Sequence, residues 1–513
     1  MNTKALKQKI LDLAIHGKLV PQNPDDEPAS KLLERIREEK KLKIENGELK
    51  ADKNDSYIFV GDDKRRYEKM PDGTVKDIED EIPFDVPEGW AWCRLKEVCT
   101  VLMGQSPEGS SVSGNSNGME FHQGKIYFTD KYLAKAENYT SDITRVAPAN
   151  SILLCVRAPV GVVNITNREI CIGRGLCAIR PKYEISENFW FYWLQYLKED
   201  FEQKATGTTF KAISVEVVKQ QFIPIPTLNE QKNIVSAIEN IFAQIDTLEQ
   251  NKSDLQTAIK HAKSKILDLA IHGKLVPQDS SDEPASVLLE KLRAEKESKI
   301  KAGELKRDKN DSYIYKSSTD NCHCEKFADG TVRKIDIPFD LPDSWSWCNG
   351  YELFNPMKSR KPSGLVFKYI DIETIDNKKH RVIRPKELSV SEAPSRASRE
   401  VANGDVLFSL VRPYLENIAL ITEENQDCIA STGFFVCKPK KVLDSKFLFF
   451  LMTTSYVVQG LNEFMKGDNS PSINGDDILR WLYPLPPLSE QKRIVEKIEN
   501  AFAKLDFIAE QLA

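Results

Sequence analysis

The sequence contains no long hydrophobic run, and this absence restricts where the protein can act. A membrane-spanning helix needs about 20 consecutive apolar residues, and no segment supplies them. The first residues, MNTKALKQKILDLAIHG, are amphipathic and lack the apolar core of a secretory signal. We therefore expect no membrane segment and a cytoplasmic location.

Motifs for nucleotide, methyl-group or metal chemistry are also missing. No GxxxxGK[ST] loop is present to hold a nucleotide phosphate. The step Asn355-Pro356 lacks the following Pro and aromatic residue with which an amino-methyltransferase would hold a flipped base. Cys322-His323-Cys324 has no second CxxC or HxxxH to complete four zinc ligands. We expect no catalytic residue, no bound cofactor and no metal site in this chain.

The chain does contain an internal repeat, and one copy of the repeated unit is divided between the two ends of the chain. Residues 9–22, KILDLAIHGKLVPQ, return unchanged at 265–278, and the phrase PIPTLNEQK at 224–232 returns as PLPPLSEQK at 484–492. Residues 488–513 followed by 1–16 therefore make a second copy of the central segment that begins after Pro226. A circular repeat of this kind predicts a closed object with pseudo-twofold symmetry.

The repeated segment has the pattern of a long helix. Between 229 and 272 the apolar positions alternate steps of four and three, which is the 3.5-residue spacing of a coiled coil. This seam includes Ile234, Ile238, Leu248, Leu255 and Ile259. Gly17 and Gly273 are expected to end the two copies, and Glu230 and Glu490 stand in the first turns, where a carboxylate favours the helix dipole. The length of about 65 Å suits a spacer.

Two divergent regions lie between the helical segments. The matched phrases IPFDVPEGWAWC and IPFDLPDSWSWC open them, and the Pro-x-Pro phrases close them. We divide the chain into an N-terminal helical region, 1–89, a first variable domain, 90–226, a central helical region, 227–344, a second variable domain, 345–486, and a C-terminal helix, 487–513.

Each variable domain reads as α+β. Apolar runs at 151–157, 162–166 and 171–181 predict buried strands in the first, and 406–412, 418–422 and 428–439 predict their counterparts in the second. One aromatic-rich helix follows in each, at 188–201 and 445–461. A polar loop with a central glycine precedes the exit, at 205–211 and 465–471.

Taken together, these motifs resemble the specificity subunit of type I restriction-modification enzymes along essentially the whole chain. The resemblance implies two target-recognition domains on an antiparallel pair of helices, each domain reading one half of a bipartite double-stranded DNA site. It also implies two modification subunits that methylate adenine with S-adenosylmethionine, and restriction subunits that use ATP and Mg²⁺. The specificity subunit itself is expected to be non-catalytic.

Candidate DNA contacts in the first domain are polar residues at strand ends and in loops. Gln105, Ser106, Gln123 and Lys125 have the donor and acceptor groups that read base edges in a major groove. Arg157 ends a predicted strand and Lys211 lies in the closing loop. Each has a plainer alternative, a flexible surface loop for the polar residues and an internal ion pair for Arg157.

The second domain offers basic clusters instead. We expect phosphate or base contacts from Lys358, Arg360, Lys361, Lys379, Arg381, Arg412 and Lys466. The predicted strands place Arg412 at the end that corresponds to Arg157, and Lys466 in the loop that corresponds to that of Lys211.

Positive charge is scarce for a protein that binds DNA. The net charge is −5, whereas a self-sufficient DNA-binding domain is usually basic. Partners are therefore expected to supply part of the phosphate neutralisation, and the repeated charged helices at 28–46 and 284–302 are expected to dock two copies of one partner. The competing hypothesis is a coiled-coil scaffold whose two α+β domains bind proteins.

Overall fold

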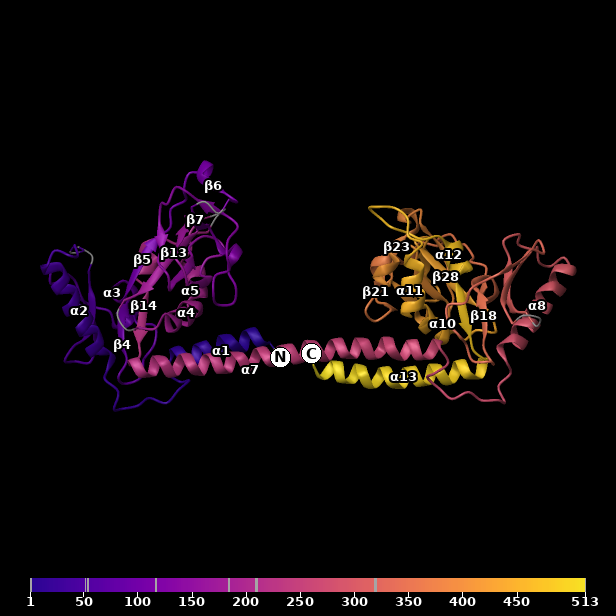
Figure 1. The fold of residues 1–513 in the computed structure, drawn as a ribbon, viewed down its shortest axis with the longest axis horizontal. Coiled ribbons are helices and arrows are strands. Elements are labelled where there is room, and N and C mark those ends of the chain that lie inside the picture. The colour runs from indigo at the N-terminus through magenta and orange to yellow at the C-terminus, as the bar shows by residue number, and fades with distance from the viewer. Residues whose placement is uncertain are drawn as a thin grey trace. The chain divides into compact units, whose positions relative to one another are not determined.

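The computed structural model describes residues 2–50, 52, 55–115, 118–182, 185–207, 211–317 and 321–512. The chain forms two compact units, the first unit Met1–Asn251 and the second unit Lys252–Ala513 (Figure 1). Among the described residues, none of the helices combines the length and apolar character that a membrane crossing would need.

Helix α7 (Leu228–Ile271) begins in the first unit and ends in the second. Its bounds lie within one residue of the helix expected at 229–272. In the first unit α1 (Thr3–Ile15) lies along α7, and in the second unit α13 (Leu488–Gln511) does so (Figure 1). Thr3 contacts Glu249 and Lys7 pairs with Asp246, so α1 runs antiparallel to α7.

The seam of α7 is buried only in part. Ile234, Ile238 and Ile259 are buried, as the 3.5-residue pattern predicts. Leu248 and Leu255, seam positions on either side of the boundary between the units, are 53% and 41% exposed. The continuous seam expected from the sequence is therefore interrupted here, because burial needs a neighbouring helix as well as the right spacing.

The first unit builds its variable domain from an antiparallel sheet, ordered β11-β10-β13-β5, a mixed sheet, ordered β6-β8-β7-β12-β9, and a two-stranded pair, β14-β4. Helix α4 packs with the first sheet and α5 packs against α4, and α3 and α6 lie near the edge strand β5. The bounds are β4 (Ala91–Arg94), α3 (Leu95–Val98), β5 (Cys99–Met103), β6 (Val112–Ser113), β7 (Met119–His122), β8 (Tyr139–Thr140), β9 (Val146–Ala147), β10 (Ser151–Cys155), β11 (Val163–Thr166), β12 (Ile170–Ile172), β13 (Leu176–Pro181), α4 (Glu187–Tyr196), α5 (Lys198–Lys204), α6 (Val215–Lys219) and β14 (Phe222–Ile225).

The second unit has a corresponding arrangement, with sheets ordered β19-β28-β25-β26 and β23-β20-β27-β24, and the pairs β18-β29 and β21-β22. The bounds are β18 (Ser346–Asn349), α9 (Gly350–Leu353), β19 (Phe354–Asn355), β20 (Val366–Ile370), β21 (Ile375–Asp376), β22 (Arg381–Val382), β23 (Lys386–Ser389), β24 (Ala397–Glu400), β25 (Val406–Ser409), β26 (Ile418–Leu420), β27 (Ile429–Ser431), β28 (Phe434–Pro439), α10 (Ser445–Met452), α11 (Ser455–Asn462), α12 (Gly475–Arg480) and β29 (Leu482–Leu485).

Two details of the expected elements are wrong. The single aromatic-rich helix of each domain is in fact two helices, α4 and α5 or α10 and α11, and Thr454 caps the second of the latter pair by accepting from the Val457 N–H at 3.3 Å. The runs 171–181 and 428–439 are each two strands separated by a turn.

A small helix-and-sheet module recurs in both units. In the first it consists of α2 (Ala29–Glu45), β1 (Tyr57–Val60), β2 (Arg66–Lys69) and β3 (Val75–Asp77), and in the second of α8 (Ala285–Lys301), β15 (Ser312–Lys316), β16 (His323–Phe327) and β17 (Val332–Lys334). Arg37 pairs with buried Glu97 at 2.7 Å, and Arg293 pairs with buried Glu352 at 2.6 Å. Each module therefore packs against the variable domain of its own unit through an equivalent arginine–glutamate pair.

Candidate nucleic-acid interface

Four segments of the first unit meet at the turn between β12 and β13. The Gln105 N–H, just after β5, donates to the Ile172 carbonyl at 3.0 Å. The Gly173 N–H donates to the carbonyl of His122, at the end of β7, at 2.8 Å. The Val156 N–H, after β10, donates to the Gly175 carbonyl at 3.0 Å. These backbone bonds bring strand ends that are distant in sequence to one edge of the two sheets.

The polar residues predicted in the first domain gather around this turn. Gln123, Lys125 and Arg157 line one pocket of about 150 Å³, and all three are exposed. The Lys211 carbonyl accepts from the Ala158 N–H at 3.0 Å, which places the closing loop beside Arg157. Residues 208–210 of that loop lie outside the described residues. We call the surface formed by residues 104–106, 123–126, 157–158, 173–175 and 211 the recognition face.

One exposed residue of the recognition face was not predicted. Arg174 stands at the tip of the turn, and the Ser106 hydroxyl accepts from both its backbone N–H and its Nε, each at 3.3 Å. Arg174 was missed as a candidate because the sequence of the run 171–181 predicts one continuous strand. The signal that could have found it is the pair of glycines, Gly173 and Gly175, on either side.

Glycines allow the backbones of the recognition face to approach closely. A Cβ on Gly104 would collide with the Gly173 carbonyl, and a Cβ on Gly175 would collide with the Gln123 carbonyl. Neither position can take a larger residue without displacing backbone. The glycines thus fix the spacing between the segments that carry Gln105, Gln123 and Arg174.

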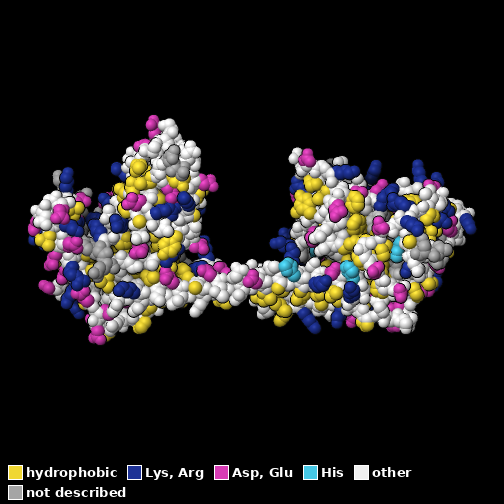
Figure 2. Space-filling view, viewed as in Figure 1, with side chains coloured by type: hydrophobic (Ala, Val, Ile, Leu, Met, Phe, Trp, Pro, Cys, Tyr) yellow, Lys and Arg dark blue, Asp and Glu magenta, His cyan; other side chains and the backbone are white. Residues whose placement is uncertain are grey.

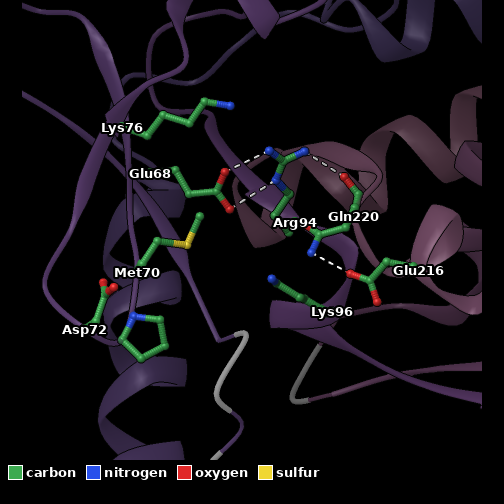
Figure 3. A pocket seen from close by; sticks show the side chains of 9 residues that line it. Glu68, Met70, Asp72, Lys76, Arg94, Lys96, Glu216 and Gln220 are labelled. Atoms are coloured by element: carbon green, nitrogen blue, oxygen red, sulfur yellow. Dashed lines mark hydrogen bonds and ion pairs between the residues drawn. The ribbon is translucent and has the colours of Figure 1, made fainter.

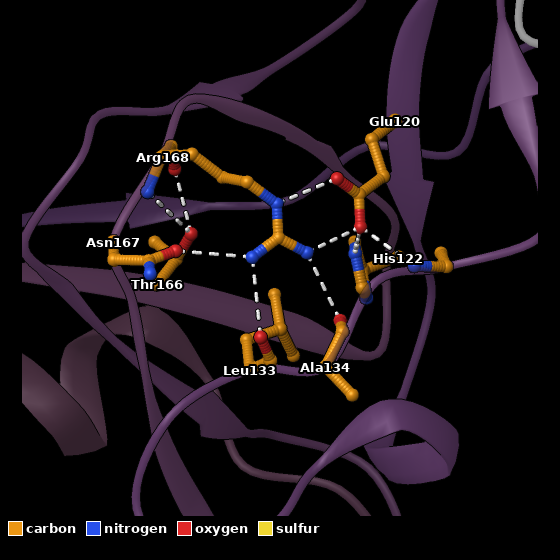
Figure 4. A network of polar contacts seen from close by, with 8 residues as sticks. Glu120, His122, Leu133, Ala134, Thr166, Asn167 and Arg168 are labelled. Carbon is orange, nitrogen blue, oxygen red and sulfur yellow. Dashed lines mark hydrogen bonds and ion pairs between the residues drawn. The ribbon is translucent and has the colours of Figure 1, made fainter.

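A partly buried polar network holds the end of β7, the strand that leads into the recognition face (Figure 4). Arg168 donates to both carboxylate oxygens of Glu120, from Nε at 2.7 Å and from Nη2 at 2.5 Å, and to the Leu133 and Ala134 carbonyls. Burial alone would raise the pKa of Glu120, but these bonds, the Ala136 N–H and His122 lower it to about 2. The ionised carboxylate holds His122, the residue before Gln123, at 2.8 Å.

The second unit has an equivalent turn, and backbone hydrogen bonds fix the correspondence. The Leu410 N–H donates to the Gly433 carbonyl at 2.8 Å, as Val156 does to Gly175. Arg360 and Lys361 follow β19 along the chain as Gln105 and Ser106 follow β5, but their backbone partners differ, because the Arg360 N–H donates to the Ser398 carbonyl at 2.9 Å and the Gln105 N–H to the Ile172 carbonyl. Lys358 and Lys361 are exposed. The Arg360 guanidinium donates to the Asp427 and Cys428 carbonyls at 2.6 and 2.8 Å, so it holds its own loop.

The expected equivalence of Arg157 and Arg412 is wrong by one residue. The Arg412 N–H donates to the Pro471 carbonyl at 2.8 Å, in the way that Ala158 donates to Lys211. Arg412 therefore occupies the position of Ala158, and the residue at the position of Arg157 is Val411. The error arose because the two runs were matched on their arginines, whereas the hydrogen-bond register determines the correspondence.

The neighbourhood of Arg412 includes the closing loop. Its Nη2 donates to the Asn469 carbonyl at 3.0 Å, and its φ of 47° is in the left-handed region. The bridges Lys466–Ser472 and Thr206–Ala212 correspond, so Lys466 occupies the position of Thr206 rather than that of Lys211. Arg412 and Lys466 thus flank the same loop, and both are exposed.

Lys379 and Arg381 lie on a separate hairpin formed by β21 and β22. The Asn377 side-chain amide donates to the Leu415 carbonyl at 2.8 Å, and this bond ties the hairpin to the segment that follows Arg412. Both basic side chains are exposed. They therefore add positive charge near Arg412.

A second pocket, of about 630 Å³, lies between β2, β4 and α6 (Figure 3). Arg94 pairs there with Glu68 at 2.8 Å and donates to the Gln220 carbonyl at 2.7 Å. Burial lowers the pKa of Lys96 on its wall. These contacts join the helix-and-sheet module to the variable domain. The pocket is therefore part of the junction between the two.

Acidic and basic side chains are interspersed on the visible face of each unit (Figure 2). This mixture agrees with the net charge of −5. An interface with nucleic acid on this chain must therefore depend on a few placed donors rather than on a broad positive field.

Comparisons with known proteins assign these features to a family. The model of the type I restriction modification DNA specificity domain matches residues 87–257 and 357–513. The chain is 24% identical to the type I restriction enzyme EcoAI specificity subunit of Escherichia coli, over 97% of this chain and 88% of that protein. It is 25% identical to the EcoEI specificity subunit of Escherichia coli, over 99% and 90%.

Among solved structures, the HsdS subunit from Thermoanaerobacter tengcongensis is 27% identical over 48% of this chain and 50% of that chain, with a TM-score of 0.31. The family model covers more than half of the present sequence, once in each unit. The chain belongs to the family of type I restriction-modification DNA specificity subunits.

Proposed function

We propose that each unit carries one target-recognition domain, residues 90–226 and residues 345–486, and that each domain reads one half of a bipartite DNA site. The main observation that supports this proposal is the recognition face, where donors from four separated segments meet at one turn. The family model matches two separate segments of the chain, and the second unit has a turn that shares one backbone hydrogen bond, Leu410 to Gly433, with the first, Val156 to Gly175. Two separate recognition surfaces suit a site with two separate halves.

The DNA contacts that we propose divide by chemistry. In the first domain, side chains on the recognition face approach base edges and the nearest phosphates. In the second domain, exposed basic residues approach phosphates, while Arg360 acts through the loop that it holds. The proposed set is Gln105, Ser106, Gln123, Lys125, Arg157, Lys211, Lys358, Arg360, Lys361, Lys379, Arg381, Arg412 and Lys466.

We propose that the helices set the distance between the half-sites. In this proposal α7 pairs with α1 and α13 as an antiparallel coiled coil, and the arrangement has pseudo-twofold symmetry. The regions 1–89, 227–344 and 487–513 then form one structural frame. Two observations support it. The ion pairs Lys7–Asp246 and Lys263–Asp506 link α7 to α1 and to α13, and the repeated module packs equally in both units.

The chain is a non-catalytic subunit, and catalysis lies with its partners. We propose that the repeated helix-and-sheet modules dock two modification subunits, one on each, because two equal surfaces suit two copies of one protein. Restriction subunits complete the proposed assembly. Partner surfaces then supply the positive charge that this chain lacks.

A domain exchange tests the proposed division of labour. Residues 345–486 are replaced by the corresponding domain of a relative, and the chimaera is expressed with its modification subunits. Methylome sequencing should show that one half of the recognised sequence changes while the other half and the gap between them stay the same. The reciprocal exchange of residues 90–226 is the matched control and should change only the other half. A chimaera that alters both halves would refute separate reading.

A further inference from the structure

Arg174 is held in a way that leaves part of its guanidinium available. The Ser106 hydroxyl accepts from Nε and from the backbone N–H of Arg174, which fixes the root of the side chain and one edge of the fork. Within the described part of the chain, the two Nη groups have no hydrogen-bond partner. The residue is exposed at the tip of the turn, so these donors are accessible to a ligand while the Nε end of the side chain is held.

The surroundings of Arg174 limit how the side chain can be displaced. Gly173 and Gly175 lie against Phe121 and Gln123, with no room for a Cβ on Gly175. The turn is bonded to the ends of β5, β7 and β10. An arginine on such a rigid support loses little conformational freedom when it binds, which favours specific recognition.

We infer that Arg174 reads a guanine in the half-site of the first recognition domain, and that Ser106 is its positioning residue. A guanidinium that presents two parallel N–H donors matches the O6 and N7 acceptors of guanine in the major groove, and no other base presents this pair. The inference rests on the proposed function and names the base class that this face takes.

The second unit supports the assignment by contrast. Thr432 occupies the position of Arg174, because Gly433 corresponds to Gly175. The parallel pairing of β20 with β27 matches that of β7 with β12, so Asp371 is the first residue after its strand, as Gln123 is. The second domain thus has a carboxylate where the first has an amide. The two faces are therefore built for different bases.

Guanine analogues provide the test. The assembled complex with modification subunits is titrated with duplexes in which each guanine of the first half-site is replaced in turn by 7-deazaguanine, which lacks the N7 acceptor. At one position the affinity of the wild-type complex should fall by about 5- to 150-fold. In the complex with Arg174→Ala, binding to the unmodified duplex should be weaker, and the same replacement should have no further effect.

Three further variants make the result specific. Arg180→Ala removes an exposed arginine from β13, the strand that leaves the turn, and should keep the full sensitivity to 7-deazaguanine. Ser106→Ala should reduce that sensitivity in part, and Ser106→Thr should restore it. If Arg174→Ala impairs folding, as seen in a thermal melt, Arg174→Met replaces it and should likewise abolish the sensitivity, because it keeps the aliphatic stem but has no N–H donor.

Failure of the inference is separable from failure of the proposed function. A first half-site without guanine, or a full 7-deazaguanine effect that persists in Arg174→Ala, would overturn the role of Arg174 while leaving sequence recognition intact. A wild-type complex that bound no duplex specifically would overturn the proposed function itself.

Discussion

The indole N–H of Trp90 donates to Oε2 of Glu230 at 2.7 Å. This bond joins the start of the first recognition region to the first turn of α7, and Gln22 occupies the other carboxylate oxygen at 3.0 Å. In the second unit Trp345 donates to Glu490 at 2.9 Å. Burial raises the pKa of Glu230, although both hydrogen bonds act to lower it.

Loss of the Trp90 donor should therefore lower the stability of the fold. We expect Trp90→Phe to lower the free energy of unfolding by about 1–3 kcal/mol more than a tryptophan-to-phenylalanine change without a hydrogen bond, because a buried carboxylate loses a donor. Urea titration followed by circular dichroism measures it.

Trp92→Phe is the matched control for this prediction. Trp92 is buried, and its Nε1 has no hydrogen-bond partner among the described residues, so its replacement removes only volume. Equal costs for the two variants would show that the bond to Glu230 adds no stability.

The Glu120–Arg168 pair should make stability depend on pH. The folded pKa of Glu120, about 2, lies below the ordinary value of 4.5, so its contribution is present above the ordinary value and is lost as the pH falls towards 2. The difference in unfolding free energy between wild type and Glu120→Gln should therefore be larger at about pH 6 than at about pH 3. Glu137→Gln, which removes an exposed carboxylate, is the control. A difference that did not change with pH would contradict the prediction.

Shortening α7 should shorten the gap between the half-sites. Deletion of residues 251–257 removes one heptad at the boundary between the units, or about 10 Å of helix, which corresponds to roughly 3 base pairs. Methylome sequencing should show the same two half-sequences with a shorter gap. Leu255→Ala, which changes the same segment but not its length, should leave the gap unchanged. Altered half-sequences with the original gap would show that α7 is not the spacer.

Charge removal on the β21–β22 hairpin should weaken binding without changing specificity. If Lys379 and Arg381 contact phosphates, the double change to alanine should lower the slope of log affinity against log salt by about 2. Filter binding of the assembled complex over a salt series measures this slope. Lys497→Ala, an exposed lysine on α13, should not change it. A changed half-sequence would instead indicate base contacts.

The sequence predicted those parts of the fold that depend on local periodicity. The bounds of α7 were correct to one residue, and the buried strands β10 and β25 fell within their apolar runs. The exposure of Leu248 and Leu255 could not be predicted, since it depends on where α1 and α13 pack. The break between α4 and α5 was hidden because no glycine or proline marks it.

For the candidate site, the sequence supplied the segments but not their register. Gln105, Gln123 and Arg157 were identified from their chemistry and their place at strand ends, and the structure brings these segments together. Arg174 was missed inside an apparent strand. Arg412 was misplaced by one position because the two segments were aligned on their arginines, whereas their shared hydrogen-bond register aligns Arg412 with Ala158.

The frame of Trp90, Glu230 and Gln22, repeated as Trp345, Glu490 and Gln278, has a consequence for inheritance. Its residues lie outside the recognition sheets and make the same hydrogen bonds around two enclosed sequences that differ from each other. Recombination within the matching frame sequences would therefore join a foreign recognition region to attachment points that it already fits. A lineage could acquire a new DNA target in one genetic event, without passing through a misfolded intermediate.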